Sequence, residues 1–221
     1  FDPLYYREMR IKKLGHCCLV IEVDSKRIMT DPGSYTIEEQ IKERDIDLIL
    51  ITHEHGDHLH IESLKKILIN NPNVKIITNN GVGKLLEEAG IEYEILENKI
   101  VKEILGVKLE AHNCKHEEIF EELGQVQNTG YFINKRLFYP GDSFCNPGKP
   151  VEIIALPVAG PWTKVKDFMR YVLDVKPKVC FPVHDGMLTS FVNNAYWVPK
   201  VILPKFNIIF KTFKENKEEE F

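Results

Sequence analysis

The sequence predicts an α/β (or α+β) protein in which helices pack on the outside of β-sheets. Two observations carry this prediction. Short β-branched and aliphatic runs alternate with segments of helical periodicity through both halves of the 221-residue chain. In addition, a dense histidine cluster directly follows one of the apolar runs, as expected where a buried strand ends in a loop. Alternation of this kind favours sheets covered by helices.

The first half of the chain supplies strands and helices in nearly equal measure. In helix 61–68, Ile61, Leu64, Ile67 and Leu68 recur at the spacing of one helix face. Pro72 lies just beyond this helix, and Gly90 ends the next. The expected strands are 17–23, 27–30, 48–51 and 74–78, and the expected helices are 37–42, 61–68 and 82–89.

The second half is richer in strands. Residues 129–134 and 136–139 form a predicted hairpin that turns over Asn134 and Lys135. Residues 164–172 have the apolar spacing of an amphipathic helix, which ends before Pro177. The remaining expected strands are 100–101, 107–111, 153–156 and 178–181.

Length and charge limit the classes of function. A chain of 221 residues fits a single domain over 1–221, with the charged residues 214–221 expected as a tail or frayed helix end. The net charge of −4 offers no basic surface for nucleic acid. No apolar run approaches the ~20 residues needed to cross a bilayer. We therefore expect neither nucleic acid nor membrane as a partner.

The five cysteines contain no C-x-x-C pair, and their odd number argues against a closed disulfide framework. Reduced thiols, and with them a cytoplasmic location, are the expectation. Cys17, Cys18 and Cys180 lie in apolar strand-like runs and are expected to fill the core.

The histidine cluster comes directly after the apolar run 46–51 and ends the predicted strand. His53, His55, Asp57 and His58 offer three imidazoles and a carboxylate within six residues. These are ligand types that Zn²⁺ and related cations favour. Gly56 is expected to let the backbone turn sharply between the two ligand pairs. The cluster predicts a metal site at a strand end.

The pattern His-x-His-x-Asp-His resembles the signature of the metallo-β-lactamase-fold hydrolases, in particular their lactonase-like and phosphodiesterase-like members. Three further segments resemble family motifs in family order, so the resemblance covers most of the chain. They are Thr30-Asp31-Pro32-Gly33, Pro140-Gly141-Asp142-Ser143 and Phe181-Pro182-Val183-His184-Asp185-Gly186. The resemblance implies a four-layered αββα sandwich with metals at one edge between the sheets.

The resemblance also implies two divalent cations per chain, expected to be Zn²⁺, with Mn²⁺ or Fe as alternatives. His53, His55 and a third histidine would hold one cation. Asp57, His58 and His184 would hold the other, and Asp142 would bridge both. The third histidine is His116 or His112. The spacing to Asn128 favours His116, whereas an Ala-His pair at this step in broader relatives favours His112.

Two more residues are candidates for the surroundings of the metals. Asp31 is expected to accept a hydrogen bond from a ligating imidazole and fix its tautomer. His16 follows Gly15, and this pair resembles a Gly-His pair near the N-terminus of lactonase-like relatives. His16 is expected either to face substrate or to be an ordinary hydrogen-bonded histidine.

The expected activity is hydrolysis of a small ester, lactone or phosphodiester by a metal-bound hydroxide. Asp57 would hold the nucleophile and pass a proton to the leaving group. The alternative is a non-catalytic metal-binding or regulatory module of the same fold. The sequence predicts a small-molecule substrate, but it identifies neither that substrate nor the oligomeric state.

Overall fold

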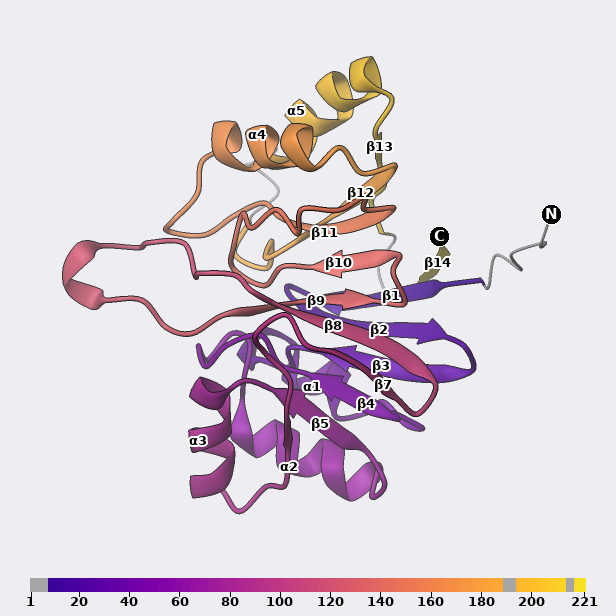
Figure 1. The fold of residues 1–221 in the computed structure, drawn as a ribbon, viewed down its shortest axis with the longest axis vertical. Coiled ribbons are helices and arrows are strands. Elements are labelled where there is room, and N and C mark those ends of the chain that lie inside the picture. Colours follow the sequence, from indigo (N-terminus) through magenta and orange to yellow (C-terminus); the bar gives the residue numbers. More distant parts are fainter. Residues whose placement is uncertain (1–7, 189–193, 214–216) are drawn as a thin grey trace.

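The computed structural model describes residues 8–188, 194–213 and 217–221. Within this part of the chain, two seven-stranded sheets pack face to face, and helices cover their outer sides (Figure 1). The first half of the chain forms most of one sheet and the second half forms the other. The pattern of alternating strands and helices in the sequence therefore produces two similar layers.

The first sheet is antiparallel where its strands follow short hairpins and parallel where a longer segment connects them. β2 pairs antiparallel with β1 and with β3. From β3 onwards, β3, β4, β5 and β6 pair parallel in that order. The strand order is β14 (Glu218–Glu220), β1 (Arg10–Gly15), β2 (Cys18–Val23), β3 (Lys26–Thr30), β4 (Leu48–Leu50), β5 (Lys75–Thr78), β6 (Glu94–Ile95).

The second sheet repeats this arrangement. The expected hairpin is present, because β9 and β10 pair antiparallel, and β10 to β13 run parallel. The strand order is β13 (Ile209–Phe210), β12 (Val179–Val183), β11 (Ile153–Pro157), β10 (Leu137–Tyr139), β9 (Thr129–Ile133), β8 (Val107–Asn113), β7 (Val101–Ile104).

The helices lie outside the two sheets. In Figure 1, α2 and α3 lie beside the first sheet, and α4 and α5 lie beyond the second. The α-helices are α1 (Ile37–Gln40), α2 (Ile61–Asn70), α3 (Asn80–Glu88), α4 (Val165–Val175) and α5 (Asn194–Ile202). Short 3₁₀ helices span Ser34–Thr36, Glu121–Leu123 and Leu203–Phe206.

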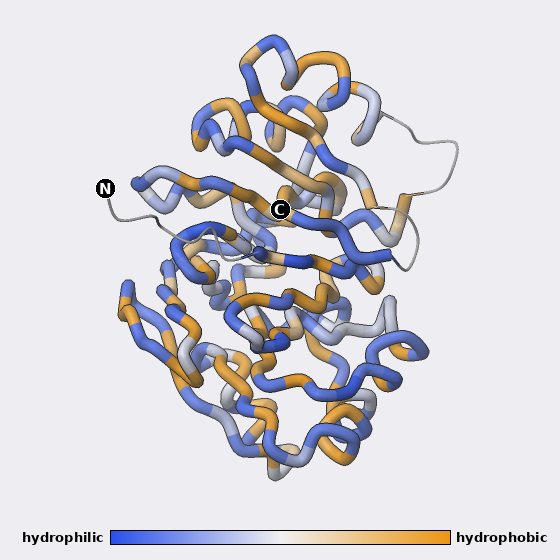
Figure 2. The backbone as a smooth tube through the Cα atoms, turned by 90° about the vertical axis from the view of Figure 1, so that its right-hand side faces the viewer, coloured by the Kyte–Doolittle hydropathy of each residue, from blue (hydrophilic) through white to orange (hydrophobic). Residues whose placement is uncertain are grey.

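Three apolar layers hold this sandwich together. Leu19 and Ile21 of β2 join the layer between the two sheets, whereas Val20 joins the layer beneath α2 and α3. Phe168 of α4 belongs to the third layer, on the outer face of the second sheet. Figure 2 shows hydrophobic and hydrophilic positions interspersed along these elements. Successive residues of a strand point to opposite faces of its sheet, so each sheet packs side chains on both sides. Two packed sheets with helices outside confirm the expected four-layered αββα sandwich.

The C-terminal residues differ from the expected charged tail. Of the predicted tail, residues 214–216 lie outside the described residues, but β14 pairs antiparallel with β1, with Arg10 opposite Glu220. The Phe221 ring packs 5.4 Å from that of Phe181. At this sheet edge, Glu218 forms an ion pair with Arg10, and Glu219 forms one with Lys211. Within the described part of the charge run, Glu218–Glu220 therefore form an edge strand.

Candidate metal centre

The loop after β4 places the histidine cluster at one end of the sandwich. His58 and Leu59 each donate a backbone N–H to the carbonyl of His55, and this closes a tight turn. The turn packs against the segment after β3 so closely that a Cβ on Gly33 would lie 1.8 Å from the Asp57 carbonyl oxygen. Gly56, in contrast, lacks a positive φ and has open space around it. The glycine that this loop requires is therefore Gly33, not Gly56.

One group of three imidazoles converges beside this loop. The rings of His53, His55 and His116 lie 4.7–4.9 Å apart, centroid to centroid. Their ligand atoms lie within 4.8 Å of one another. His53 and His116 are buried and His55 is half-buried. Three imidazole nitrogens at this separation could hold one cation.

A second group lies on the other side of His53. Asp57 and His184 approach each other, with 3.3 Å between Asp57 Oδ2 and His184 Nε2. The rings of His58 and His184 are 5.4 Å apart, and that of His58 is 4.0 Å from that of His53. His184 reaches this position from the end of β12, where it adopts a positive φ of 56°. These three residues could hold a second cation.

Asp142 lies between the two groups. Its carboxylate is 2.9 Å from His184 Nε2 and 3.1 Å from His58 Nε2 in the second group. Toward the first group it is 3.5 Å from His116 Nε2 and 3.9 Å from His53 Nε2. The side chain is 3% exposed. Asp142 is the residue placed to serve both positions.

The nitrogens that face this centre have no hydrogen bonds, although their opposite ring nitrogens are engaged. His53 Nδ1 lies 3.0 Å from Thr52 Oγ1, His58 Nδ1 lies 2.7 Å from Asp31 Oδ2, and His116 Nδ1 lies 2.6 Å from the Glu117 carbonyl. Among the described residues, the Nε2 atoms of these three histidines are buried and make no hydrogen bond, although the Asp142 carboxylate lies 3.1–3.9 Å away. Engaged Nδ1 atoms leave Nε2 lone pairs available to a cation, so the residues fit a metal.

Asp31 lies behind the second group, with its Oδ2 2.7 Å from His58 Nδ1. Its buried carboxylate receives the Thr52 backbone N–H at 2.7 Å and the Thr52 hydroxyl at 2.8 Å. The hydroxyl oxygen of Tyr139 lies 2.8 Å from the same carboxylate. Thr52 and Tyr139 were not expected to support the centre. No sequence motif marks them, because their contribution depends on the ends of β3, β4 and β10 meeting at Asp31 in the fold.

The electrostatics of the centre keep its carboxylates ionised. Burial opposes ionisation of Asp142, yet the neighbouring His58 and His184 hold its pKa well below the usual range. Burial likewise opposes ionisation of Asp57, but the hydrogen bond from His16 and the proximity of His184 lower its pKa. Burial also lowers the pKa of His53, which favours the neutral imidazole. Ionised carboxylates and a neutral imidazole are the forms that bind metal.

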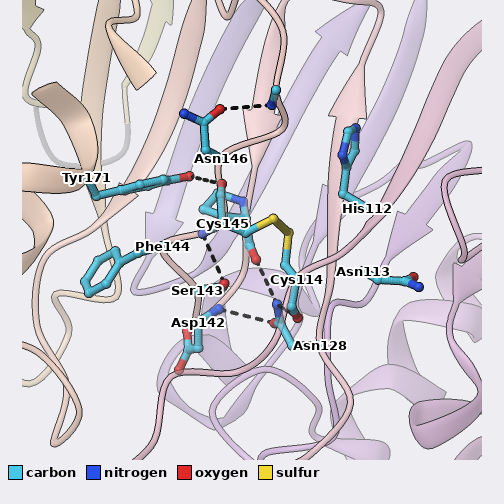
Figure 3. Close-up of a disulfide and its surroundings, with 12 residues drawn as sticks. His112, Asn113, Cys114, Asn128, Asp142, Ser143, Phe144, Cys145, Asn146 and Tyr171 are labelled. Carbon is cyan, nitrogen blue, oxygen red and sulfur yellow. Dashed lines mark hydrogen bonds between the residues drawn. A yellow bond between two sulfur atoms is a disulfide. The ribbon is translucent and has the colours of Figure 1, made fainter. Parts of the chain in front are cut away.

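The two candidates for the third histidine occupy different surroundings. His116 Nε2 faces Asp142, whereas His112 Nε2 faces Glu110 at 3.0 Å. The His112 ring packs edge-on against Phe138, at 5.3 Å. In Figure 3, His112 and Asp142 lie on opposite sides of a disulfide. The structure therefore brings His116, and not His112, to the other candidate ligands.

That disulfide joins Cys114 to Cys145, with Cα atoms 5.3 Å apart, and it corrects the expectation that all thiols are reduced (Figure 3). The two cysteines are 31 residues apart in sequence, but β8 and β10 flank β9 and bring the following loops together. Asn128 bridges the same loops by donating to the Cys114 and Pro140 carbonyls. The loops that carry His116 and Asp142 are thus tied twice.

His16 comes to the second group from the turn between β1 and β2. Its ring is buried, and Nε2 lies 3.1 Å from Asp57 Oδ2. The ring does not project into open space, because Tyr35 stacks on it at 4.3 Å. Of the two expectations for His16, the hydrogen-bonded histidine agrees with this geometry.

A cavity of about 410 Å³ has none of the candidate ligands in its lining but shares Trp162 with the surroundings of the centre. Trp162 lines it and also approaches the His116 and His184 rings, at 6.2 and 5.3 Å. Phe144 and Tyr171 supply further aromatic surface, Arg170 a cationic group, and Glu117, Asp167 and Asp174 three carboxylates. This cavity could hold a small organic molecule beside the candidate ligands.

The sequence is similar to known proteins over most of its length. Residues 10–184 match the family model described as the beta-lactamase superfamily domain. Protein Rv0786c of Mycobacterium tuberculosis is 27% identical over 195 residues, which cover 86% of this chain and 90% of that protein. A UPF0173 metal-dependent hydrolase of Nanoarchaeum equitans is 28% identical over 192 residues, which cover 80% of this chain and 83% of the relative.

Solved structures show the same fold. The metallo hydrolase Igni18 from Ignicoccus hospitalis superposes with a TM-score of 0.77 at 16% identity, covering 97% of this chain and 98% of Igni18. The metallo-beta-lactamase fold protein YhfI of Bacillus subtilis superposes with a TM-score of 0.74 at 9% identity, covering 97% of this chain and 100% of YhfI. Because the family model spans most of its length, the chain belongs to the beta-lactamase superfamily domain family, with the metallo-β-lactamase fold.

Proposed function

We propose that the protein is a metal-dependent hydrolase with two divalent cations per chain, acting on a small ester, lactone or phosphodiester. His53, His55 and His116 would hold one cation, Asp57, His58 and His184 the other, and Asp142 both. Imidazole and carboxylate donors suit Zn²⁺, and they also accept Mn²⁺ and Fe. The relatives described as metal-dependent hydrolases support the same reaction class.

One observation carries the proposal. Buried polar atoms in proteins are almost always hydrogen-bonded, since an orphaned group costs about 1–3 kcal/mol. Here several converge on one small volume around Asp142 and make no hydrogen bond among the described residues. They are Nε2 of His53, His58, His116 and His184, and Oδ1 of Asp142. Bound cations would satisfy all of them together.

Each residue of the centre has a task that follows from its place. When bound, a pair of such cations supplies an activated water nucleophile and a Lewis acid that polarises a carbonyl or phosphoryl oxygen. Asp142 is buried and suited to a fixed bridging role. Asp57 is 23% exposed, so its carboxylate can reach solvent and exchange a proton with a leaving group. Trp162 and Phe144 can pack against the apolar part of a substrate beside the centre.

The first test is metal content together with hydrolysis. We expect close to two zinc, manganese or iron ions per chain in protein purified without chelators, measured by elemental analysis. A panel of nitrophenyl esters, lactones and bis-nitrophenyl phosphate should show turnover that chelator abolishes and Zn²⁺ or Mn²⁺ restores. His60→Gln is the matched control, because His60 caps α2 and accepts the Ser63 N–H rather than facing the centre. Two firmly held ions and no turnover on any substrate would instead favour a non-catalytic metal-binding module.

The choice of third histidine has its own test. His116→Ala should lower metal binding at the first position by about 100-fold or more, since loss of an outer partner alone costs about 10–100-fold. His112→Ala should leave the metal content unchanged, because that ring contacts Glu110 and Phe138 away from the centre. Elemental analysis and competition with a chromophoric chelator measure both. Loss of metal from His112→Ala alone would reverse the assignment.

A further inference from the structure

We infer that His16 is a positioning residue that holds Asp57 and the turn carrying His184 in place through a single imidazole tautomer. The inference rests on the proposed function, because Asp57 and His184 are two ligands of the second metal position. Three contacts of His16 support it, and together they fix the orientation and the tautomer of its ring.

The first contact fixes the protonation of the ring. The backbone N–H of Gly186 donates to Nδ1 of His16, with 3.0 Å between the two nitrogens. A nitrogen that accepts a hydrogen bond carries no proton, so the neutral ring must carry its proton on Nε2. Gly186 can approach this closely because it has no side chain, since a Cβ there would lie 3.0 Å from Nδ1 and 2.8 Å from the Tyr35 ring.

The second contact is a hydrogen bond from this Nε2–H to Asp57. His16 Nε2 lies 3.1 Å from Asp57 Oδ2, so the Nε2–H donates to the carboxylate. The carboxylate also faces His184 Nε2, at 3.3 Å, and it is held between the two imidazoles. Because its Nε2 lone pair is occupied by a proton, His16 cannot also be a metal ligand, although its ring nitrogen lies within 4.8 Å of possible donors on His58 and His184.

The third contact ties His16 to the backbone of His184. The His184 N–H donates to the His16 carbonyl at 3.1 Å. His16 therefore grips the turn after β12 at two points, through His184 and Gly186. The turn between β1 and β2 makes this possible, because Gly15 and His16 both have positive φ, of 147° and 46°. Tyr35 covers the outer face of the ring, which keeps His16 from acting on substrate directly.

Two matched substitutions separate the roles of the two nitrogens. In His16→Gln the side-chain amide can place an N–H where Nε2 stands and donate to Asp57. In His16→Asn the shorter side chain can accept the Gly186 N–H but cannot reach Asp57. We expect Zn²⁺ affinity at the second position to fall about 10–100-fold in His16→Asn and His16→Ala, the usual cost of losing the partner of a ligand. His16→Gln should recover most of this loss.

The measurement has two readouts. Zinc titration with elemental analysis follows both positions, and retention of the first zinc shows that each variant folds. Nitrogen-15 NMR of the histidine rings in metal-free protein, with His16 assigned through His16→Gln, reports the tautomer without any metal. An Nε2–H tautomer together with rescue by Gln supports the inference. An Nδ1–H tautomer, or equal losses in Gln and Asn, overturns it. If the wild type holds no second zinc, the proposed function fails while the NMR result still decides the tautomer.

Discussion

Asp142→Ala is expected to lose metal from both positions at once. The Asp142 carboxylate lies 2.9–3.5 Å from the Nε2 atoms of His58, His116 and His184, and these residues belong to both groups of candidate ligands. Removal of the partner of a ligand weakens metal binding by about 10–100-fold, so loss of a shared ligand should exceed about 100-fold at each position. Chelator-sensitive hydrolysis should disappear with the metal.

The comparison that gives this result its meaning is His184→Ala. His184 belongs only to the second group of candidate ligands, so His184→Ala should lose about one ion while the first position stays filled. Asp142→Asn keeps the shape of the side chain and removes its charge, which separates electrostatics from packing. Elemental analysis of the three variants, with circular dichroism to confirm folding, makes the comparison. An Asp142→Ala protein that still holds one ion as firmly as wild type would show that Asp142 does not bridge.

The sequence predicts most of this centre because its ligands lie at strand ends. The loop after β4 carries four candidate ligands in six residues, and their mutual distances are set by one short turn. His184 and Asp142 each follow a strand that reads clearly as buried and apolar. Because neighbouring parallel strands end at the same edge of the sandwich, the order of the elements predicts that the residues following these strands lie close together.

The features that the sequence did not predict depend on contacts between distant segments. Gly33 is required only because the Asp57 backbone packs against it, and nothing near residue 33 indicates that contact. Cys114 and Cys145 become partners only once β8 and β10 flank the same strand. The role of His16 depends on Gly186 in the turn after β12, which is 170 residues away from His16 in sequence. Local patterns cannot report pairings of this kind.

Secondary structure was missed where the apolar signal is weak. β1 carries three basic residues in six positions, and β14 consists of glutamates. β1 is stabilised by pairing with β14 and β2, and β14 by pairing with β1, not by a local pattern. α5 contains Pro199 in its interior, a residue that argues against a helix in any sequence-based reading. Tertiary contacts override local preference in each case.

Asp31→Ala should cause the largest loss of stability among these substitutions. Asp31 is fully buried and receives the Thr52 backbone N–H, the Thr52 hydroxyl and His58 Nδ1 within 2.7–2.8 Å. Removing one partner from a buried charged network costs about 3–5 kcal/mol, because the remaining groups stay buried without a partner. The free energy of unfolding of the metal-free protein, measured in urea, should fall by about this amount.

The same substitution should weaken the metal centre through His58. Without Asp31, the His58 ring loses the acceptor that fixes its tautomer, and metal affinity at the second position should fall about 10–100-fold.

Asp31→Asn tests whether charge is the cause, because asparagine also tolerates the positive φ of 38° at this position. The matched control is Asp47→Asn, a partly exposed carboxylate that pairs with Lys26 and receives the Arg27 N–H far from the centre. A partly exposed pair of this kind contributes about 0–1 kcal/mol, so Asp47→Asn should change stability little and metal affinity not at all. Equal effects of the two asparagine substitutions on zinc affinity would show that Asp31 acts only on overall stability, and that His58 holds its orientation without it.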